Sequence, residues 1–272
     1  MTTPHEPLGP APVLNTLTIG TGPARLVFVH GLFGQGRNFG TIAKTLADQA
    51  TSLLVDLPNH GRSPWTQEFD YGLFAGMLAA DLEARGAREQ PVVLLGHSMG
   101  GKVVMRLALD RPDLIRKLVV VDIAPANTGN PEEFQHYADA MAALDLASLT
   151  SRADADAAMR PAVPNDITRS FLLQSLHRGE NGQGWHWLPN LDLLRRSMPL
   201  MSGWPDLPGA HWDGPVLWLV GELSSLLPHR HEQAMRGYFP NTRLQVIPGA
   251  GHWVHADQPR AFADALAAFI DE

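Results

Sequence analysis

The sequence contains no cysteine, and this absence excludes several kinds of chemistry at once. A cysteine nucleophile, a disulfide bond and a thiolate metal site all need a residue that the chain does not have. The H-E-x-x-H motif is absent too, so the 12 histidines are not expected to bind a metal ion. We therefore expect a protein that needs neither a metal nor a cofactor.

Long apolar runs and basic clusters are also missing. No stretch reaches the ~20 apolar residues of a membrane-spanning helix. Residues 1–12 are rich in proline but have no basic residue and no apolar core, unlike a signal peptide. The 21 Lys and Arg residues against 28 Asp and Glu give a net charge of −7, which argues against nucleic acid or an anionic membrane as a partner. A cytoplasmic protein is expected, whereas its oligomeric state stays open.

The composition and the hydrophobic pattern indicate an α/β protein. The chain has 272 residues, of which 44% are hydrophobic and 18% charged, as in an ordinary globular protein with a sizeable core. Continuous apolar runs suit strands that are buried on both faces, and they predict strands at Val13–Ile19, Leu26–Val29, Ser52–Val55, Val92–Leu95, Leu118–Val121, Val216–Val220 and Leu244–Ile247. Helices are predicted at Asn38–Asp48, Leu73–Arg85, Met99–Leu109, His231–Tyr238 and Pro259–Ile270. The alternation predicts a mostly parallel, doubly wound sheet.

Residues 127–211 interrupt this alternation. The stretch lacks strong strand patterns and contains Trp185, Trp187 and Trp204. An insertion here would lie over the carboxyl ends of the strands, where open α/β sheets bind ligands. We expect an α/β core of residues 1–126 and 212–272 and a helical lid of residues 127–211 before the penultimate strand. A packing subdomain without substrate contact is the alternative.

The sequence G-H-S-M-G at 96–100 matches the nucleophile motif G-x-S-x-G. A four-residue apolar strand precedes it and a helical pattern follows, so Ser98 would stand at a sharp turn between strand and helix. Glycine suits positions 96 and 100, because larger side chains would collide across that turn. The motif predicts that Ser98 is a nucleophile.

A serine hydroxyl needs a base, and the base needs an acid that orients it. His252 follows three small residues after the predicted strand Leu244–Ile247, in the loop where the chain order Ser, acid, His places the base. The acid is left open between two residues. Asp122 ends the strand Leu118–Val121, and Glu222 follows the strand Val216–Val220, where Ser224 stands at the usual place of an aspartate. We favour Asp122.

A tetrahedral intermediate also needs two N–H donors. The Met99 N–H is one candidate, and the glycine loop at 30–34 offers Leu32, or else Phe33, as the other. A dinucleotide loop is the rival interpretation of these glycines, but G-x-G-x-x-G is not met. The loop 56–63 is expected to be structural.

Together these segments resemble the α/β-hydrolase superfamily over nearly the whole chain, and YbfF-type bacterial esterases most of all. The resemblance rests on HGLFG at 30–34, DLPNHGRS at 56–63, GHSMGGKV at 96–103, VVVDIAP at 119–125 and AGHWVHAD at 250–257. It implies a two-domain esterase with a helical cap that acts on short or medium acyl esters or on acyl thioesters. It also supports Asp122, because that group places its acid after this strand.

We therefore expect an esterase for a small acyl substrate, with Phe33, Trp185, Trp187 and Trp253 in contact with that substrate. The lid tryptophans could equally form the lid's own core. Two other functions stay open: transfer of the acyl group to peroxide, an alcohol or an amine, and a hydrolase-fold protein that binds a small apolar ligand without turnover.

Overall fold

The computed structural model describes residues 14–128, 131–179, 184–226 and 228–272. The segment 1–12, where we expect no signal peptide, and Val13, the predicted start of the first strand, lie outside these ranges. Among the described helices, none is both long and apolar enough to cross a membrane.

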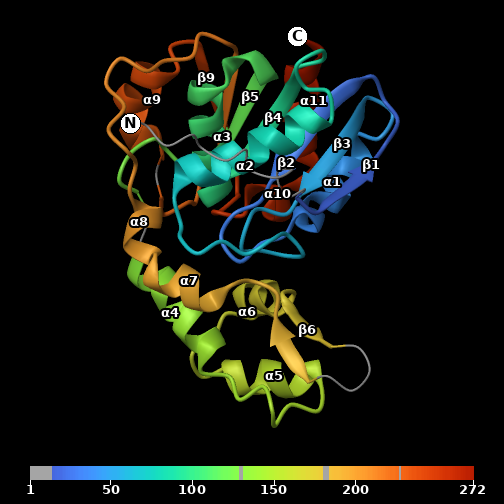
Figure 1. The fold of residues 1–272 in the computed structure, drawn as a ribbon, viewed down its shortest axis with the longest axis vertical. Helices are drawn as coiled ribbons and strands as arrows, with labels where there is room; N and C mark the ends of the chain where they lie inside the picture. Colours follow the sequence, from blue (N-terminus) through green and yellow to red (C-terminus); the bar gives the residue numbers. More distant parts are fainter. Residues whose placement is uncertain (1–13, 129–130, 180–183, 227) are drawn as a thin grey trace, which may run out of the picture.

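In the described part of the chain, seven strands form one sheet in the order β1-β3-β2-β4-β5-β8-β9. The strand β1 runs antiparallel to β3, and the other neighbouring strands are parallel. The predicted mostly parallel sheet is therefore confirmed (Figure 1). The strands span Thr16–Ile19 (β1), Ala24–Val29 (β2), Ala50–Val55 (β3), Val92–His97 (β4), Ile115–Val121 (β5), Val216–Gly221 (β8) and Thr242–Ile247 (β9).

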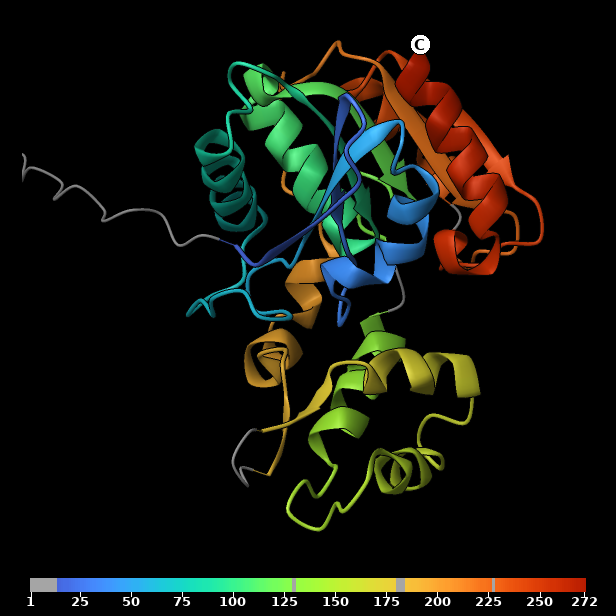
Figure 2. The same ribbon diagram turned by 90° about the vertical axis from the view of Figure 1, so that its right-hand side faces the viewer.

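The central strands are continuous apolar runs because both faces of the sheet are covered. In β2, Val27 and Val29 point into one hydrophobic cluster, whereas Leu26 and Phe28 point into the other. Successive side chains of a strand face opposite sides of the sheet, so each strand contributes to two cores. The two layers of helices that build these cores are visible on either side of the sheet in Figure 2.

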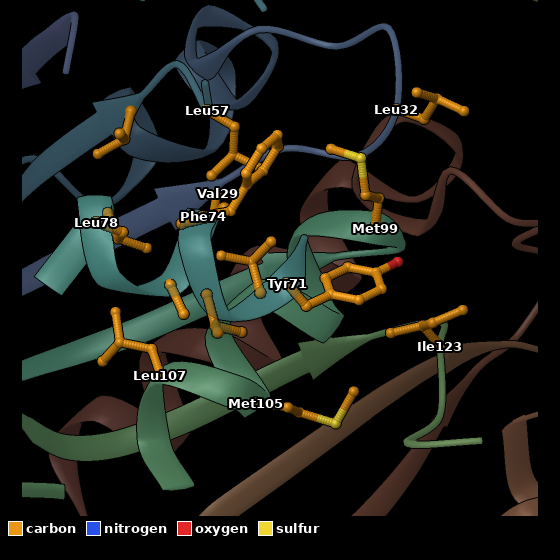
Figure 3. Packing of buried hydrophobic residues seen from close by; sticks show 14 of the residues in the cluster. Val29, Leu32, Leu57, Tyr71, Phe74, Leu78, Met99, Met105, Leu107 and Ile123 are labelled. Carbon is orange, nitrogen blue, oxygen red and sulfur yellow. The ribbon is translucent and has the colours of Figure 1, made fainter. Parts of the chain in front are cut away.

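Two helices, α2 (Tyr71–Ala84) and α3 (Met99–Asp110), pack on the first face, and α1 (Gly40–Thr45) and α11 (Pro259–Asp271) pack on the second. Figure 3 shows the first core, to which Phe74 and Leu78 of α2 and Leu107 of α3 all belong. The first predicted helix is shorter than expected because its start is a 3-10 turn at Gly36–Phe39. The helices α9 (Glu232–Tyr238) and α10 (Val254–Asp257) precede and follow β9.

In Figure 1 most of the helices and strands between Pro131 and Ser202 lie below the sheet, within residues 127–211, the stretch that we call the lid segment. It comprises helices α4 (Pro131–Ala142), α5 (Arg152–Met159), α6 (Asp166–Leu173), α7 (Leu191–Arg196) and α8 (Met198–Ser202) and the antiparallel strands β6 (Leu176–Arg178) and β7 (Trp185–Trp187). The pair β6–β7 was not predicted, because strands of three residues leave no pattern of alternation to detect.

The lid segment contacts the loops that follow β2 and β3. The Ser175 hydroxyl donates to the carbonyl oxygen of Phe33 (3.3 Å), and the Asn190 N–H donates to the carbonyl oxygen of Asn59 (2.9 Å). Arg37 adds a bond from its guanidinium to the carbonyl oxygen of Gln174 (2.7 Å). These contacts hold the insertion over the carboxyl ends of the parallel strands.

Several buried histidines are neutral in the folded protein. His60 has no exposed surface, and its Nδ1 donates to the carbonyl oxygen of Pro58 (3.0 Å). Burial lowers the pKa of His60 to about 3, and burial likewise lowers the pKa of His255 to about 3. Their unfolded pKa is near 6.5, so the unfolded chain binds more protons between pH 3 and 6.5. The contribution of these two histidines to stability is therefore fully present above pH 6.5 and is lost as the pH drops through this window.

Replacing His60 by Asn should weaken this dependence on pH. Asparagine keeps an N–H near the place of Nδ1 but does not titrate. Each such histidine contributes about 1.4 kcal/mol per pH unit to the slope of unfolding free energy. Urea unfolding at pH 7.5 and pH 5 should show a smaller loss of stability in His60→Asn than in the wild type. The exposed His211→Asn is the matched control, and an unchanged slope in His60→Asn would contradict the prediction.

Candidate active site

Ser98 stands at the sharp turn between β4 and α3. Its φ of 53° lies in the left-handed region, which is strained for a residue with a side chain. The turn is held because the Ser98 N–H donates to the carbonyl oxygen of Val121 at the end of the neighbouring strand (3.0 Å). The hydroxyl is therefore presented at the carboxyl edge of the sheet, as the motif predicted.

The two glycines of the motif are required by close approach of the backbone. A Cβ atom on Gly96 would collide with the carbonyl oxygen of Gly100. A Cβ atom on Gly100 would collide with the carbonyl oxygen of His30, in the loop after β2. No side chain fits at either position without a shift of the backbone, so these glycines fix the distance between the turn and the loop at 30–34.

His252 lies in the loop between β9 and α10, and its ring reaches Ser98. Its Nε2 is 3.1 Å from the Ser98 Oγ, and its Nδ1 is 2.8 Å from the Oδ2 of Asp122. A carboxylate only accepts, so Nδ1 carries the proton and Nε2 is free to accept from the serine hydroxyl. The loop is anchored by His97, whose Nε2 donates to the carbonyl oxygen of His252 (2.8 Å).

Asp122 is fully buried and accepts hydrogen bonds from three groups. The Gly221 N–H donates to its Oδ1 (3.1 Å), while His252 Nδ1 and the Ser224 hydroxyl both donate to its Oδ2. Buried charge is costly unless it is hydrogen-bonded, and these donors stabilise the ionised carboxylate. The alternative acid, Glu222, is exposed and accepts from the Gly249 N–H (2.8 Å). The structure thus brings Asp122 to His252 and leaves Glu222 outside the site.

Ser224 is a residue of the site that sequence reasoning missed. We noted it only as a departure from the usual aspartate at that place. Its hydroxyl donates to the carboxylate of Asp122, so Ser224 supports the acid instead of supplying it. The signal was present in the sequence, because a donor after β8 is what a carboxylate after β5 requires.

The expected oxyanion donors lie beside Ser98. Met99 is the first residue of α3, so its N–H has no acceptor within the helix. Leu32 lines the same cavity as Ser98, and a Cβ atom on Gly31 would lie 3.1 Å from the Cβ of Ser98, which places this loop against the nucleophile. Phe33, the next residue of this loop, has a left-handed φ of 61°.

Two cavities meet at Ser98. They share Leu32, Ser98 and Phe134. The first is mainly apolar and is further lined by Tyr71, Met99, Lys102, Ile123, Thr128, Pro131, Met198, Met201, Ser202 and Leu226. The second is further lined by Phe33, His97, Tyr137, Thr168, Phe171, Leu172, His252 and Trp253. Among the described residues, no group of three or more His, Asp or Glu side chains is placed to hold a metal ion.

The structure brings only some of the predicted substrate contacts to these cavities. Phe33 and Trp253 line the second cavity. Trp185 and Trp187 line neither one, because their indole N–H groups donate to the carbonyl oxygens of Leu149 and Met141 inside the lid segment. These two tryptophans match the alternative that we left open, in which they form the lid's own core.

The loop 56–63 has the structural role that we expected. The Asp56 carboxylate accepts from the Asn15 side chain (2.7 Å), the Gly36 N–H (2.8 Å) and the Arg62 N–H (3.0 Å). It therefore ties the start of β1 and the loop after β2 to the loop after β3. None of its contacts reaches Ser98.

This sheet and this arrangement of serine, histidine and aspartate define an α/β hydrolase, and the chain belongs to the alpha/beta hydrolase family, whose model matches residues 26–265. The chain is 37% identical to the sn-1-specific diacylglycerol lipase ABHD11 of Mus musculus, over 97% of this chain and 86% of the relative. It is 34% identical to the esterase YbfF of Escherichia coli, over 91% and 93%. A solved structure, a marine microorganism esterase, superposes with a TM-score of 0.90 at 30% identity, covering 95% and 99%. The expected resemblance is confirmed.

The close approach at the turn makes Gly96 sensitive to substitution. In Gly96→Ala, the new methyl group must push against the Gly100 carbonyl, and overpacking of this kind costs about 1–3 kcal/mol. The matched control is Gly76→Ala on α2, where a Cβ atom meets nothing within 4 Å and should stabilise the helix by about 0.5–1 kcal/mol. Urea unfolding of both variants measures this, and a Gly96→Ala protein as stable as the wild type would contradict it.

Substitution of the two candidate acids should cause very different losses of kcat. Asp122→Asn should lower kcat by about 10,000-fold, because an amide does not hold the required tautomer of the imidazole. Ser224→Ala should lower kcat by about tenfold, since Asp122 loses one donor. Glu222→Gln should stay within about twofold of wild type, as expected for a surface substitution. Steady-state hydrolysis of a p-nitrophenyl ester measures kcat for all three variants. A larger loss of kcat in Glu222→Gln than in Asp122→Asn would assign the acid to Glu222.

Proposed function

We propose that the chain hydrolyses carboxylic esters of small molecules, and acyl thioesters by the same chemistry, through an acyl-enzyme formed on Ser98. Its family and its relatives make it a carboxylic ester hydrolase. The observation that supports the proposed mechanism is a continuous series of hydrogen bonds, from Ser98 Oγ to His252 (3.1 Å) and from His252 to Asp122 (2.8 Å). Ser98, at one end of this series, lies where the two cavities meet.

In the first step the Ser98 Oγ attacks the ester carbonyl and its proton moves to His252 Nε2. The carbonyl oxygen becomes an oxyanion, which accepts from the N–H groups of Leu32 and Met99. The bond between the carbonyl carbon and the leaving oxygen then breaks, and His252 returns the proton to that oxygen. Asp122 stabilises the imidazolium that exists between these two transfers.

In the second step a water molecule attacks the acyl-enzyme. His252 Nε2 takes a proton from the water, the bond to Ser98 Oγ breaks, and the same proton returns to the serine hydroxyl. The acid leaves and the resting site is restored. Each step therefore uses the same base and the same N–H donors.

The position of His252 indicates which cavity holds the alcohol part of the ester and which holds the acyl part. The leaving oxygen receives its proton from Nε2, so the alcohol lies on the histidine side. His252 and Trp253 line the second cavity, which we assign to the alcohol group. Ile123, Met198, Met201 and Leu226 line the first cavity, which we assign to the acyl chain.

The acyl acceptor could also be peroxide, an alcohol or an amine. These acceptors would attack the same acyl-enzyme, and none of the contacts of Ser98 or His252 distinguishes them from water. Product analysis with a competing alcohol separates the two activities. We expect free acid as the main product, and a transfer product in excess at millimolar alcohol would make the chain an acyltransferase.

The proposed function is tested by a fluorophosphonate probe together with p-nitrophenyl esters from acetate to palmitate. Wild-type protein should be labelled and should hydrolyse the shorter esters. Ser98→Ala should lose both properties because it has no nucleophile, and its loss of kcat should be about 10^6-fold. If the folded wild type is neither labelled nor active on any ester, the chain is a binding protein that keeps the hydrolase fold.

A further inference from the structure

Lys102 has a buried amino group that takes no part in the proposed mechanism. It lies on α3, one helical turn after Ser98, with only 1% of its surface exposed. Its Nζ is 2.8 Å from the carbonyl oxygen of Ser202, 2.8 Å from that of Gly203 and 3.1 Å from that of Ala126. The carbonyl oxygen of Met201 is at 3.4 Å. Within the described residues Lys102 forms no ion pair.

These carbonyl oxygens use all the donors that the ammonium group has. A lysine has three N–H donors, and three carbonyl oxygens lie within 3.1 Å of Nζ. Burial lowers the pKa of Lys102 to about 7 and so opposes its charge, whereas the hydrogen bonds to the facing carbonyl oxygens favour the ammonium form. The ammonium group therefore has no free donor for a carboxylate on the substrate, and its role lies in the segments that it joins.

Lys102 joins the entry to the lid segment with the end of its last helix, α8. Ala126 is the last residue before the chain enters it, and Ser202 ends α8, from which the chain returns to β8. These two places also bind each other, because the Thr128 N–H donates to the carbonyl oxygen of Ser202 (3.0 Å). One side chain of the core therefore fixes the entry to the lid segment and the end of α8 at a single point.

The side chain of Tyr71, which also belongs to the core, holds the end of α8 as well. The Tyr71 hydroxyl donates to the carbonyl oxygen of Met201 (2.7 Å), and its oxygen points out of the hydrophobic core between Met99 and Ile123 (Figure 3). Met198 and Met201 of α8 line the first cavity together with Lys102 itself. The position of α8 therefore determines how far that cavity extends from Ser98.

We propose that Lys102 is a positioning residue that limits the length of the acyl chain, because it holds the entry to the lid segment to the end of α8 and so fixes α8 against the acyl cavity. This proposal rests on the proposed function, which assigns the first cavity to the acyl group. In the absence of the ammonium group, the carbonyl oxygens of Ala126, Ser202 and Gly203 have no shared donor. The end of α8 then moves outward and the cavity lengthens.

The chain offers a matched control for Lys102. Lys117 is also a buried lysine at a helix end: it lies on β5, and its Nζ donates to the carbonyl oxygens of Phe269 (2.7 Å) and Ile270 (3.3 Å) of α11. It packs on the other face of the sheet and lines neither cavity. Lys117→Met removes the same kind of interaction without touching the lid segment.

The experiment compares kcat/KM for p-nitrophenyl octanoate and acetate in wild type, Lys102→Met and Lys117→Met. The ratio of octanoate to acetate should rise about tenfold in Lys102→Met, the discrimination that a single methylene group can provide in an apolar pocket. It should stay unchanged in Lys117→Met. Tyr71→Phe removes one oxygen atom and keeps the ring, so it should fold well and give a smaller rise in the same direction.

A measurement that does not depend on turnover distinguishes a failure of the Lys102 proposal from a failure of the proposed function. Alkylphosphonate p-nitrophenyl esters of the same chain lengths label Ser98 in one step, and their second-order rates should show the same change of ratio. If Lys102→Met and Tyr71→Phe slow octanoate and acetate equally, or if Lys117→Met shifts the ratio as much, Lys102 has only a structural role. If the wild type is neither labelled nor active, the proposed function fails instead.

Discussion

The buried carboxylate of Asp122 is the constraint on which the site depends. It has no exposed surface and needs donors, which come from Gly221 at the end of β8, from Ser224 after β8 and from His252 after β9. The sheet order β4-β5-β8-β9 makes these strands consecutive neighbours. Their carboxyl ends therefore carry Ser98, Asp122, Ser224 and His252 in this order, which is the order of the proposed nucleophile, acid, support and base. A different strand order would leave the carboxylate without partners.

Backbone strain is concentrated at the same edge of the sheet. Phe33, Ser98 and Asp122 have positive φ angles although none is a glycine, and Asn59 in the next loop is the fourth such residue among those described. Each such conformation costs on the order of 1–3 kcal/mol and persists only when the surroundings enforce it. Here the enforcing elements are β2, β4 and β5, whose carboxyl-terminal halves have side chains buried on both faces. The rigid centre of the sheet stabilises the strained loops that build the site.

Local chemistry accounts for the features that could be predicted from the sequence. The central strands were found because burial on both faces leaves continuous apolar runs, and Ser98 and His252 because glycines mark the turns that carry them. Residue patterns alone left the acid open between Asp122 and Glu222, since that choice depends on which strand ends lie beside His252. Ser224 was overlooked for the same reason. The contacts of Trp185 and Trp187 were equally out of reach, because a lid core and a substrate cavity need the same apolar residues.

The position of Asp122 also determines how the connection to the lid segment is held. With the acid after β5, the segment that carries Asp122 leads within four residues to Ala126, the start of the lid connection that Lys102 holds. Between them, the Ile123 carbonyl oxygen accepts from the indole of the fully buried Trp218 (2.6 Å). The segment 122–126 is therefore held by the core, so a shift of the chain beyond Ala126 would leave the hydrogen bond between His252 and Asp122 in place.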